Sequence, residues 1–247
     1  MNASITRRVS YPTSIPQSVL LLTLFAGCVQ PRFVGGEAES DLRAPATLRA
    51  RPNILFILVD DLDIHSVGKV PGLRRGPDDP DAGIVMPKLK KHVIDRGLTF
   101  KNAFVSNPVC CPSRTTILRG QYPHNSGVLT NSRDNGGFYS FLQNDCEKSN
   151  IATWLQAAGY RTAMMGKFLN GYPLPNNQNY FPPGWTHWWG GMGGEIYRQF
   201  DYKLNIDGKP TNFGSNPEEY LTDVLADKAV EVIQAAHASG TPFFIHL

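Results

Sequence analysis

The chain has 247 residues, of which 41% are hydrophobic and 18% are charged, and its formal net charge is +3. This composition is typical of a soluble globular protein that buries a substantial core, and the small net charge gives no reason to expect a nucleic-acid partner. The charges in "MPKLKKHVIDR" and "DRGLTFKNAF" are interpreted as one solvated helix face.

The first residues are typical of an export signal. Arg7 and Arg8 precede the apolar run "VLLLTLFAG", which is too short to span a bilayer. The run ends directly before Cys28, as in a bacterial lipoprotein cleavage box, so residues 1–28 are predicted to be an export or lipoprotein signal. Lipidation of Cys28 would tether the protein to a membrane, and a free cysteine in an ordinary secretory signal is the alternative.

Residues 29–51 are mixed in charge and show no hydrophobic period, which predicts a tether. The mature protein is therefore expected to be exported, and to be periplasmic, extracellular or anchored as a lipoprotein.

Globular structure is predicted from residue 52 onward. Residues 54–59, in "RPNILFILVDDLD", form an unbroken apolar run that predicts a strand buried on both faces. "MPKLKKHVIDRG" predicts a helix from Pro87 to Gly97, and "LTFKNAFV" predicts a second strand.

The later elements repeat this alternation. "NIATWLQAAGYRTAMMGK" predicts a helix capped by Asn150, followed by a strand over 160–165. Asp207 and Gly208 predict a hairpin turn, Asn216 is expected to cap a long helix that starts at Pro217, and "TPFFIHL" predicts a last strand. Strands alternating with helices predict an α/β fold with a doubly wound, mainly parallel sheet flanked by helices.

Asp60 and Asp61 stand where the first strand ends. Sites gather at the carboxyl ends of the strands in such sheets, and two adjacent carboxylates need a counter-charge. A hard divalent cation with oxygen ligands, calcium or magnesium, would supply it, and a helix cap or turn is the alternative.

The stretch "NPVCCPSRTTILRG" carries two adjacent cysteines, Cys110 and Cys111. Their spacing does not suit a zinc site, which needs paired ligands, and a disulfide between neighbours would be strained. The pattern that fits is C-x-P-S-R starting at Cys110. With it, the chain resembles the type I, formylglycine-dependent sulfatases of the alkaline phosphatase superfamily, and "NILFILVDDLD" and "YRTAMMGK" support the resemblance over 52–247.

The resemblance implies the following site. Cys110 would be converted by a formylglycine-generating maturation enzyme to formylglycine, whose hydrated gem-diol is the nucleophile. Arg114 would bond the diol, and Lys167 would reach the oxygens of the sulfate. Asp60 and Asp61 would bind calcium, with magnesium as the other candidate, together with an oxygen of residue 110. The expected substrate is a sulfated carbohydrate or aryl sulfate.

The chain departs from the family pattern in several places. Many sulfatases have histidine where Leu169 stands, and Asn170, which follows it, is a candidate to bind substrate in its place. His124, just beyond the nucleophile helix, is a catalytic candidate with a capping role as the alternative. The segment "GKFLNGY" is most similar to the N-acetylglucosamine-6-sulfatase and extracellular heparan sulfatase group, which implies glucosamine-6-sulfate units. Three tryptophans could stack on a sugar or form a buried cluster: Trp185, Trp188 and Trp189.

The resemblance also implies a longer protein. Its Asp-Asn metal-ligand pair, second lysine and further histidine have no counterparts here, and His246 comes too early in the last strand to be that histidine. Residues 52–247 are therefore interpreted as the N-terminal part of a truncated catalytic domain, which is not expected to be active by itself.

Two other functions stay open at this point. One is a phosphonate or phosphate monoester hydrolase of the same superfamily, and the other is a non-catalytic exported carbohydrate-binding protein. Cys111 and Cys146 also leave an alternative open, because export would allow a disulfide between them, whereas Cys111 could equally be a small buried apolar residue.

Overall fold

The computed structural model describes residues 51–62, 67, 83–100 and 102–247. The predicted export signal, and the predicted tether apart from Arg51, lie outside the described residues. Within the described ranges, no helix is long and apolar enough to cross a membrane.

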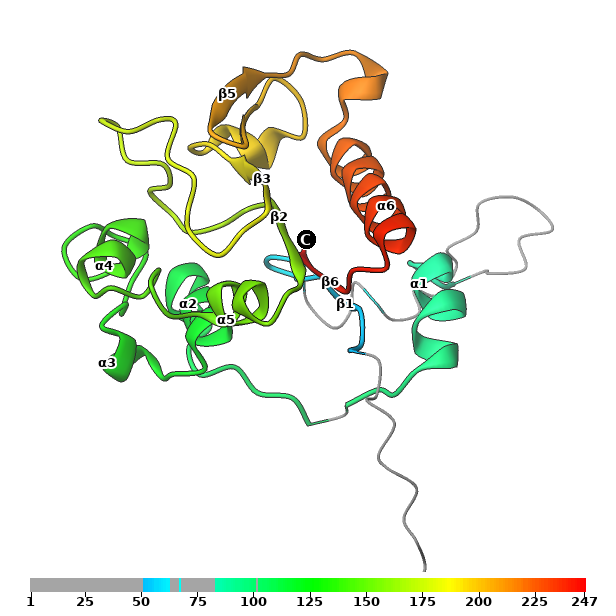
Figure 1. The fold of residues 1–247 in the computed structure, drawn as a ribbon, viewed down its shortest axis with the longest axis horizontal. Coiled ribbons are helices and arrows are strands. Elements are labelled where there is room, and N and C mark those ends of the chain that lie inside the picture. The colour runs from blue at the N-terminus through cyan, green and yellow to red at the C-terminus, as the bar shows by residue number, and fades with distance from the viewer. Residues whose placement is uncertain (1–50, 63–66, 68–82, 101) are drawn as a thin grey trace, which may run out of the picture. The chain divides into compact units, whose positions relative to one another are not determined.

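A mixed, mostly parallel sheet organises the described residues (Figure 1). Its strand order is β1-β6-β2-β3-β4-β5, with parallel pairing from β1 to β3 and antiparallel pairing from β3 to β5. The strands are β1 (Ile54–Phe56), β2 (Arg161–Gly166), β3 (His187–Gly191), β4 (Lys203–Ile206), β5 (Lys209–Asn212) and β6 (Phe243–His246). This confirms the predicted fold class.

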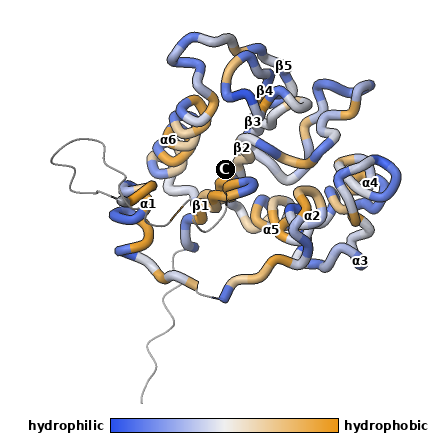
Figure 2. Tube along the Cα trace, turned by 180° about the vertical axis from the view of Figure 1, so that it is seen from behind, coloured by the Kyte–Doolittle hydropathy of each residue, from blue (hydrophilic) through white to orange (hydrophobic). Residues whose placement is uncertain are grey.

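Helices cover both faces of the sheet. The face under α2 (Cys110–Arg119), α4 (Gly137–Gln143) and α5 (Ile151–Ala157) buries one hydrophobic cluster, and α6 (Leu221–Ser239) buries a second. Met164 belongs to the first cluster, whereas its neighbours Ala163 and Met165 belong to the second, because successive side chains of a strand point to opposite faces. Figure 2 shows the hydrophobic stretches of β1, α2, α5 and α6, in contrast to the hydrophilic loops.

Local signals account for several element boundaries. Asn150 caps α5 by accepting hydrogen bonds from the backbone of the first turn, as predicted. Asp207 and Gly208 have positive φ angles of 48° and 87°, which the tight turn between β4 and β5 requires. Asn216 forms a capping box, but it opens a 3₁₀ turn, η4 (Pro217–Glu219), and α6 begins only at Leu221, later than predicted.

Three predictions near the start of the domain differ from the structure. No strand forms in the described part of "LTFKNAFV", where Phe100 and Phe104 are 75% and 91% exposed, because no strand of the described residues pairs with it. β1 is shorter than predicted and is not buried on both faces. It lies at the edge of the described sheet, so Leu55 is 46% exposed. The predicted helix from Pro87 divides into α1 (Pro87–His92) and the 3₁₀ helix η2 (Ile94–Arg96).

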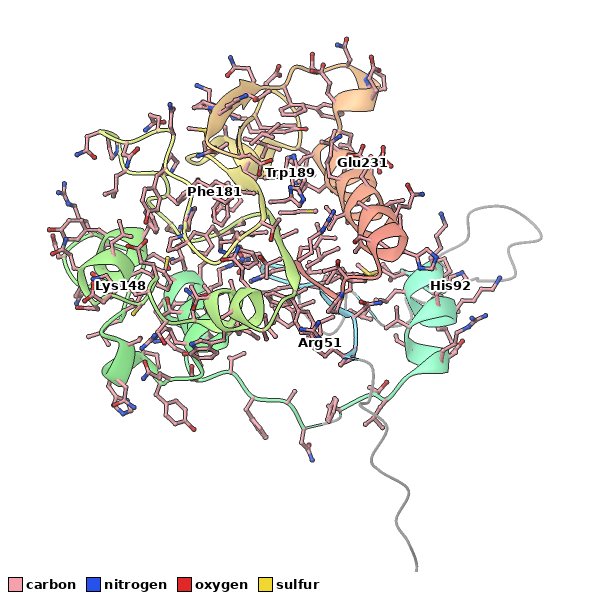
Figure 3. All side chains as sticks on the ribbon, viewed as in Figure 1. Arg51, His92, Lys148, Phe181, Trp189 and Glu231 are labelled. Atoms are coloured by element: carbon pink, nitrogen blue, oxygen red, sulfur yellow. The ribbon has the colours of Figure 1, made fainter. Side chains whose placement is uncertain are left out.

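The tryptophans belong to the core. Trp185, Trp188 and Trp189 are all buried. Of the two alternatives, they therefore form a buried cluster and are not available to stack on a sugar. Figure 3 shows Trp189 and Phe181 among the interior side chains, while Lys148 lies at the periphery.

Of the two alternatives for Cys111 and Cys146, the structure excludes the disulfide. Both are free, buried thiols with different partners. Cys111 Sγ contacts Asn170, whereas Cys146 Sγ lies 3.5 Å from the carbonyl oxygen of Ser126. The two cysteines act as small buried side chains on the α2 face of the sheet.

The buried His246 predicts a pH-dependent stability. Its burial, assisted by the charge of Arg114, lowers the pKa of His246 to about 3, and neither ring nitrogen has a hydrogen-bond partner among the described residues. The unfolded chain takes up the proton near pH 6.5, so the stabilising contribution is complete above pH 6.5 and is lost as the pH falls towards 3. Between pH 7 and pH 5, we expect a loss of about 2 kcal/mol from this residue.

Urea unfolding at several pH values measures this contribution. The His246→Leu variant should show a flatter pH dependence than the parent between pH 7 and pH 5, because the buried titrating group is gone. Equal slopes for the two proteins would contradict the assignment.

Candidate active site

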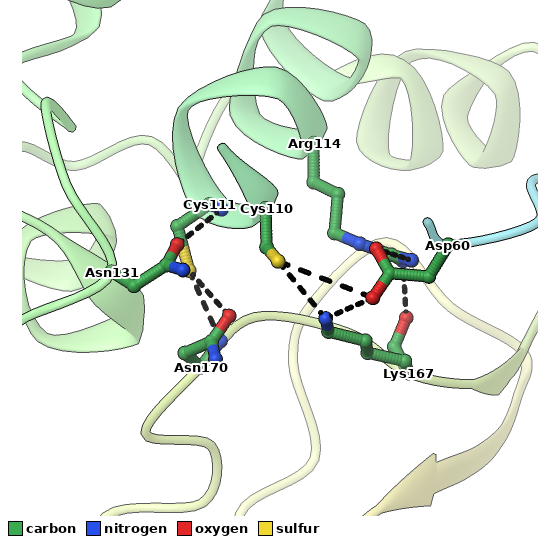
Figure 4. A network of polar contacts seen from close by, with 7 residues as sticks. All are labelled: Asp60, Cys110, Cys111, Arg114, Asn131, Lys167 and Asn170. Atoms are coloured by element: carbon green, nitrogen blue, oxygen red, sulfur yellow. Dashed lines mark hydrogen bonds and ion pairs between the residues drawn. The ribbon is translucent and has the colours of Figure 1, made fainter. Parts of the chain in front are cut away.

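Three segments far apart in the sequence meet at the carboxyl end of the parallel strands. Asp60 follows β1, Lys167 follows β2, and Cys110 is the first residue of α2. Figure 4 shows their side chains converging with that of Arg114, one turn further along α2. This is the edge at which sites gather in open α/β sheets.

The first turn of α2 is capped by a residue that is distant in the sequence. Val109, the residue before the helix, makes no side-chain cap. Instead, the backbone N–H of Cys111 donates to Oδ1 of Asn131, at 2.8 Å, which satisfies a donor of the first helical turn. Gly120 ends the helix with a φ of 64°, a conformation that favours glycine. Both ends of the helix that carries Cys110 are therefore set.

The Asp60 carboxylate joins the three segments. One oxygen accepts from Arg114 Nη2 at 3.2 Å, and the other is bonded to Lys167 Nζ. Arg114 also donates from Nη1 to the carbonyl oxygen of Lys167, at 2.6 Å. Arg114 is only 5% exposed, so its charge needs these acceptors.

The electrostatics of the network favour its charged form. Burial acts to raise the pKa of Asp60, but the hydrogen bond and charge of Lys167, and then those of Arg114, outweigh it and lower this pKa. Burial acts to lower the pKa of Lys167, and its hydrogen bonds, first with Asp60, raise it above its ordinary value. Both side chains are therefore ionised at neutral pH.

The two adjacent cysteines have different surroundings. Lys167 Nζ lies 3.1 Å from Cys110 Sγ, and Asp60 Oδ2 lies 4.0 Å from it. Cys111 points into the core, and burial raises the pKa of its thiol to about 11. Of the two cysteines, only Cys110 contacts the charged side chains, namely the Lys167 ammonium and the Asp60 carboxylate.

A cavity of about 540 Å³ adjoins the network. Asp60, Asp61, Arg114 and Lys167 line it, and the backbone at Asp61 has a positive φ of 53°. Two carboxylates are suitable oxygen donors for a calcium ion, but calcium takes six to eight ligands. The described residues contain no group of three or more His, Cys, Asp or Glu that could hold a metal ion, so they would supply only part of the coordination.

Two sequence-predicted residues lie elsewhere. Asn170 contacts Cys111 rather than Cys110: its backbone N–H lies 3.0 Å from the sulfur. His124, on α3 (Pro123–Ser126), is exposed and stacks on Tyr122 at 5.9 Å, with no contact to the charged network.

The structure also adds residues that the sequence did not single out. Tyr197, on the 3₁₀ helix η3 (Glu195–Arg198), lies with its ring centroid 5.0 Å from Lys167 Nζ. Asn131 caps α2, the helix that begins at Cys110. Neither belongs to a recognisable motif, so only the tertiary contacts reveal them.

The fold and the converging charges define a class of protein. The family model for "Sulfatase" matches residues 52–247, and the chain belongs to the sulfatase family. Among relatives, an arylsulfatase of Volvox carteri is 35% identical over 206 residues, which cover 82% of this chain and 29% of the relative. The human N-acetylglucosamine-6-sulfatase is 32% identical over 199 residues, which cover 79% of this chain and 33% of the relative.

A solved structure has the same fold. It is a complex described as containing its substrate D-glucosamine-2-N,6-O-disulfate, and it is similar with a TM-score of 0.53 at 24% identity, over 79% of this chain and 33% of that chain. The chain thus spans about a third of the length of these two relatives.

The unequal surroundings of the cysteines predict unequal reactivity. In the unmodified protein, iodoacetamide should label Cys110 under native conditions and leave Cys111 and Cys146 unlabelled, because those two are 0% and 1% exposed and burial raises the pKa of both. Mass spectrometry of tryptic peptides measures the labelling. Labelling of all three in denaturant is the control, and native labelling of Cys111 at the rate of Cys110 would contradict the structure.

Proposed function

We propose that the whole protein that carries this chain hydrolyses sulfate esters through a formylglycine formed from Cys110. The observation that carries the proposal is the position of Cys110, at the head of α2 in the C-x-P-S-R motif and 3.1 Å from the Lys167 ammonium. In the mature protein, the oxygens of the hydrated aldehyde would take the place of the Cys110 sulfur.

The proposed reaction has two stages. One hydroxyl of the diol loses its proton and attacks the sulfur atom, a sulfur–oxygen bond forms, and the alcohol leaves with a proton. The second hydroxyl of the sulfated diol then loses its proton, the aldehyde re-forms, and the carbon–oxygen bond to sulfate breaks. Water adds to the aldehyde and restores the diol, which makes the overall reaction a hydrolysis. Serine or cysteine has no second hydroxyl, so each would remain trapped as the ester.

Lys167 and Arg114 would supply charge stabilisation. Negative charge shifts among the sulfate oxygens in the transition state, and ammonium and guanidinium groups that are already held in place cost no reorganisation at that moment. The Asp60 carboxylate holds both cations, so their positions do not depend on substrate.

A divalent metal ion belongs to the same proposal. Asp60, Asp61 and an oxygen of residue 110 would hold calcium, or magnesium, with the remaining ligands from outside the described residues. Bound there, the ion would neutralise sulfate oxygens and favour the ionised form of a diol hydroxyl.

The proposed substrates are sulfated sugars, with glucosamine-6-sulfate units first. This choice rests on the relatives, which include N-acetylglucosamine-6-sulfatases, and on the solved neighbour, described with a disulfated glucosamine as its substrate. We further propose that the protein is exported and depends on a formylglycine-generating enzyme, with Cys28 as a membrane tether.

Two measurements test the proposal: the mass of the tryptic peptide that contains residue 110, and the rate of sulfate release. Coexpression with a formylglycine-generating enzyme should give a tryptic peptide whose residue 110 is lighter than cysteine, and the same protein should release sulfate from 4-nitrophenyl sulfate and glucosamine 6-sulfate. Faster hydrolysis of an aryl phosphonate would favour the phosphonate or phosphate monoesterase instead. An unmodified Cys110 in an inactive but sugar-binding protein would favour the non-catalytic alternative.

Lys167 is expected to contribute to the rate. In the whole, modified protein, Lys167→Ala should lower kcat on 4-nitrophenyl sulfate by about 10²- to 10³-fold, because a preorganised cation is removed from the developing charge. The control is Lys209→Ala, since Lys209 is an exposed lysine on β5. A change of less than about threefold would remove Lys167 from the proposed mechanism.

Asp61 offers a separate test of the metal site. Asp61→Ala should abolish turnover and weaken calcium binding, measured by isothermal titration calorimetry, while leaving the conversion of Cys110 intact. Conversion should persist because the maturation enzyme acts on the C-x-P-S-R segment before folding. Hydrolysis at the parental rate would show that Asp61 does not bind the metal.

A further inference from the structure

A second cavity lies beside the nucleophile helix, outside the charged network. Its volume is about 480 Å³, within the range of small-molecule sites. Asp60, Cys110 and Lys167 do not line it. Its lining includes Asn131, Arg133, Phe138, Tyr139, Asn170 and Leu174.

The cavity adjoins the nucleophile through Cys111. Asn131 and Asn170 both line the cavity, and both are bonded to Cys111, the neighbour of Cys110. Two residues that line this cavity therefore contact the first turn of α2. A ligand in the cavity would lie next to the segment that carries the nucleophile.

The side-chain amides of the wall leave their donors free. Oδ1 of Asn131 must be the atom that meets the Cys111 N–H, because a backbone N–H can only donate, and Oδ1 of Asn170 accepts from the Cys111 thiol at 3.3 Å. In the described part of the chain, neither amide nitrogen has a hydrogen-bond partner. The unused group of each asparagine is therefore an NH₂ donor.

Arg133 adds an uncompensated cation. Its guanidinium lies 4.6 Å from the centroid of the Tyr139 ring, and no carboxylate of the described residues pairs with it. No Asp or Glu lines the cavity. A guanidinium held on a ring face keeps its N–H groups available for two parallel bonds to a carboxylate or a sulfate.

The remaining lining suits the ring of a sugar. Tyr139 and Leu174 supply apolar surface, against which the C–H face of a pyranose can pack. Donors without acceptors, a free guanidinium and apolar walls together favour an acceptor-rich, negatively charged saccharide over a cation or a neutral apolar ligand.

We propose that this cavity binds an anionic group of the saccharide substrate, a carboxylate or a further sulfate, through Arg133 and the amides of Asn131 and Asn170. The inference rests on the proposed function for the class of ligand, since the substrate there is a sulfated sugar. Arg133 then determines specificity and takes no part in the chemical step.

Kinetics on three sugars test the assignment in the whole, modified protein. The sugars are glucosamine 6-sulfate, glucosamine 2-N,6-O-disulfate, and a disaccharide that joins 6-O-sulfated glucosamine to a uronate. Arg133→Gln should raise KM about five- to twentyfold for a substrate whose extra anion occupies the cavity, with kcat and the rate on 4-nitrophenyl sulfate unchanged. A raised KM for the disulfated sugar would identify the bound anion as a sulfate. A raised KM for the disaccharide would identify it as the uronate carboxylate.

Two further variants separate binding from folding. Arg133→Lys should recover part of the affinity, because lysine keeps the positive charge. The recovery should be incomplete, because an ammonium cannot form the two parallel hydrogen bonds of a guanidinium. Arg96→Gln is the matched control, since Arg96 is an exposed arginine of η2 that lines neither cavity. An unchanged KM for both doubly anionic sugars in Arg133→Gln would overturn the proposal, as would an equal loss on 4-nitrophenyl sulfate.

Calorimetry keeps this test independent of turnover. If the protein hydrolyses none of the esters, the proposed function fails, but titration with the same three sugars still decides the cavity. Weaker binding of a doubly anionic sugar by Arg133→Gln than by Arg96→Gln supports the site, and equal binding rejects it.

Discussion

The Asp60 carboxylate is the constraint on which the candidate site depends. It lies between Arg114 and Lys167, and thereby ties the end of β1 to α2 and to the end of β2. The three groups come from segments that are more than fifty residues apart in the sequence, and Figure 4 shows their side chains meeting. A partly buried cation without this partner would carry a desolvation cost, so the carboxylate keeps both cations charged and in place.

The same carboxylate is also the proposed metal ligand, and the two roles are compatible. In the described residues it pairs with two cations, of which Lys167 contacts Cys110. With a divalent ion and a sulfate ester present, the negative charges in the site would increase together with the positive ones. Positive and negative groups thus alternate in the site. Removal of any one charged group would leave the charge of its neighbour uncompensated.

Cys110 and Cys111 are adjacent in the first turn of α2, but their side chains have different surroundings. Cys110 is the first residue of α2 and lies towards Lys167, whereas Cys111 lies in the core, against Asn170. Successive positions on a helix point about 100° apart, so adjacent residues cannot share one environment. The contact of residue 110 with Lys167 and the packing of residue 111 therefore follow from the same backbone geometry.

Much of the fold could be predicted from local patterns. The C-x-P-S-R motif, the paired aspartates after an apolar strand and the lysine after β2 are local signals, and so are the cap at Asn150 and the turn at Asp207–Gly208. Strand alternation with helices predicted the parallel sheet, because a parallel connection needs a crossover helix.

Only the tertiary structure decided which apolar residues find partners. "LTFKNAFV" is apolar enough for a strand but pairs with none in the described residues, and β1 is half exposed because it lies at an edge. Cys111 and Cys146 lack a bridge, because each contacts a different partner. The contacts of Asn131, Tyr197 and Arg133 follow from distances across the fold, which no spacing along the chain encodes. Sequence thus determined the chemistry available, and packing determined which side chains meet.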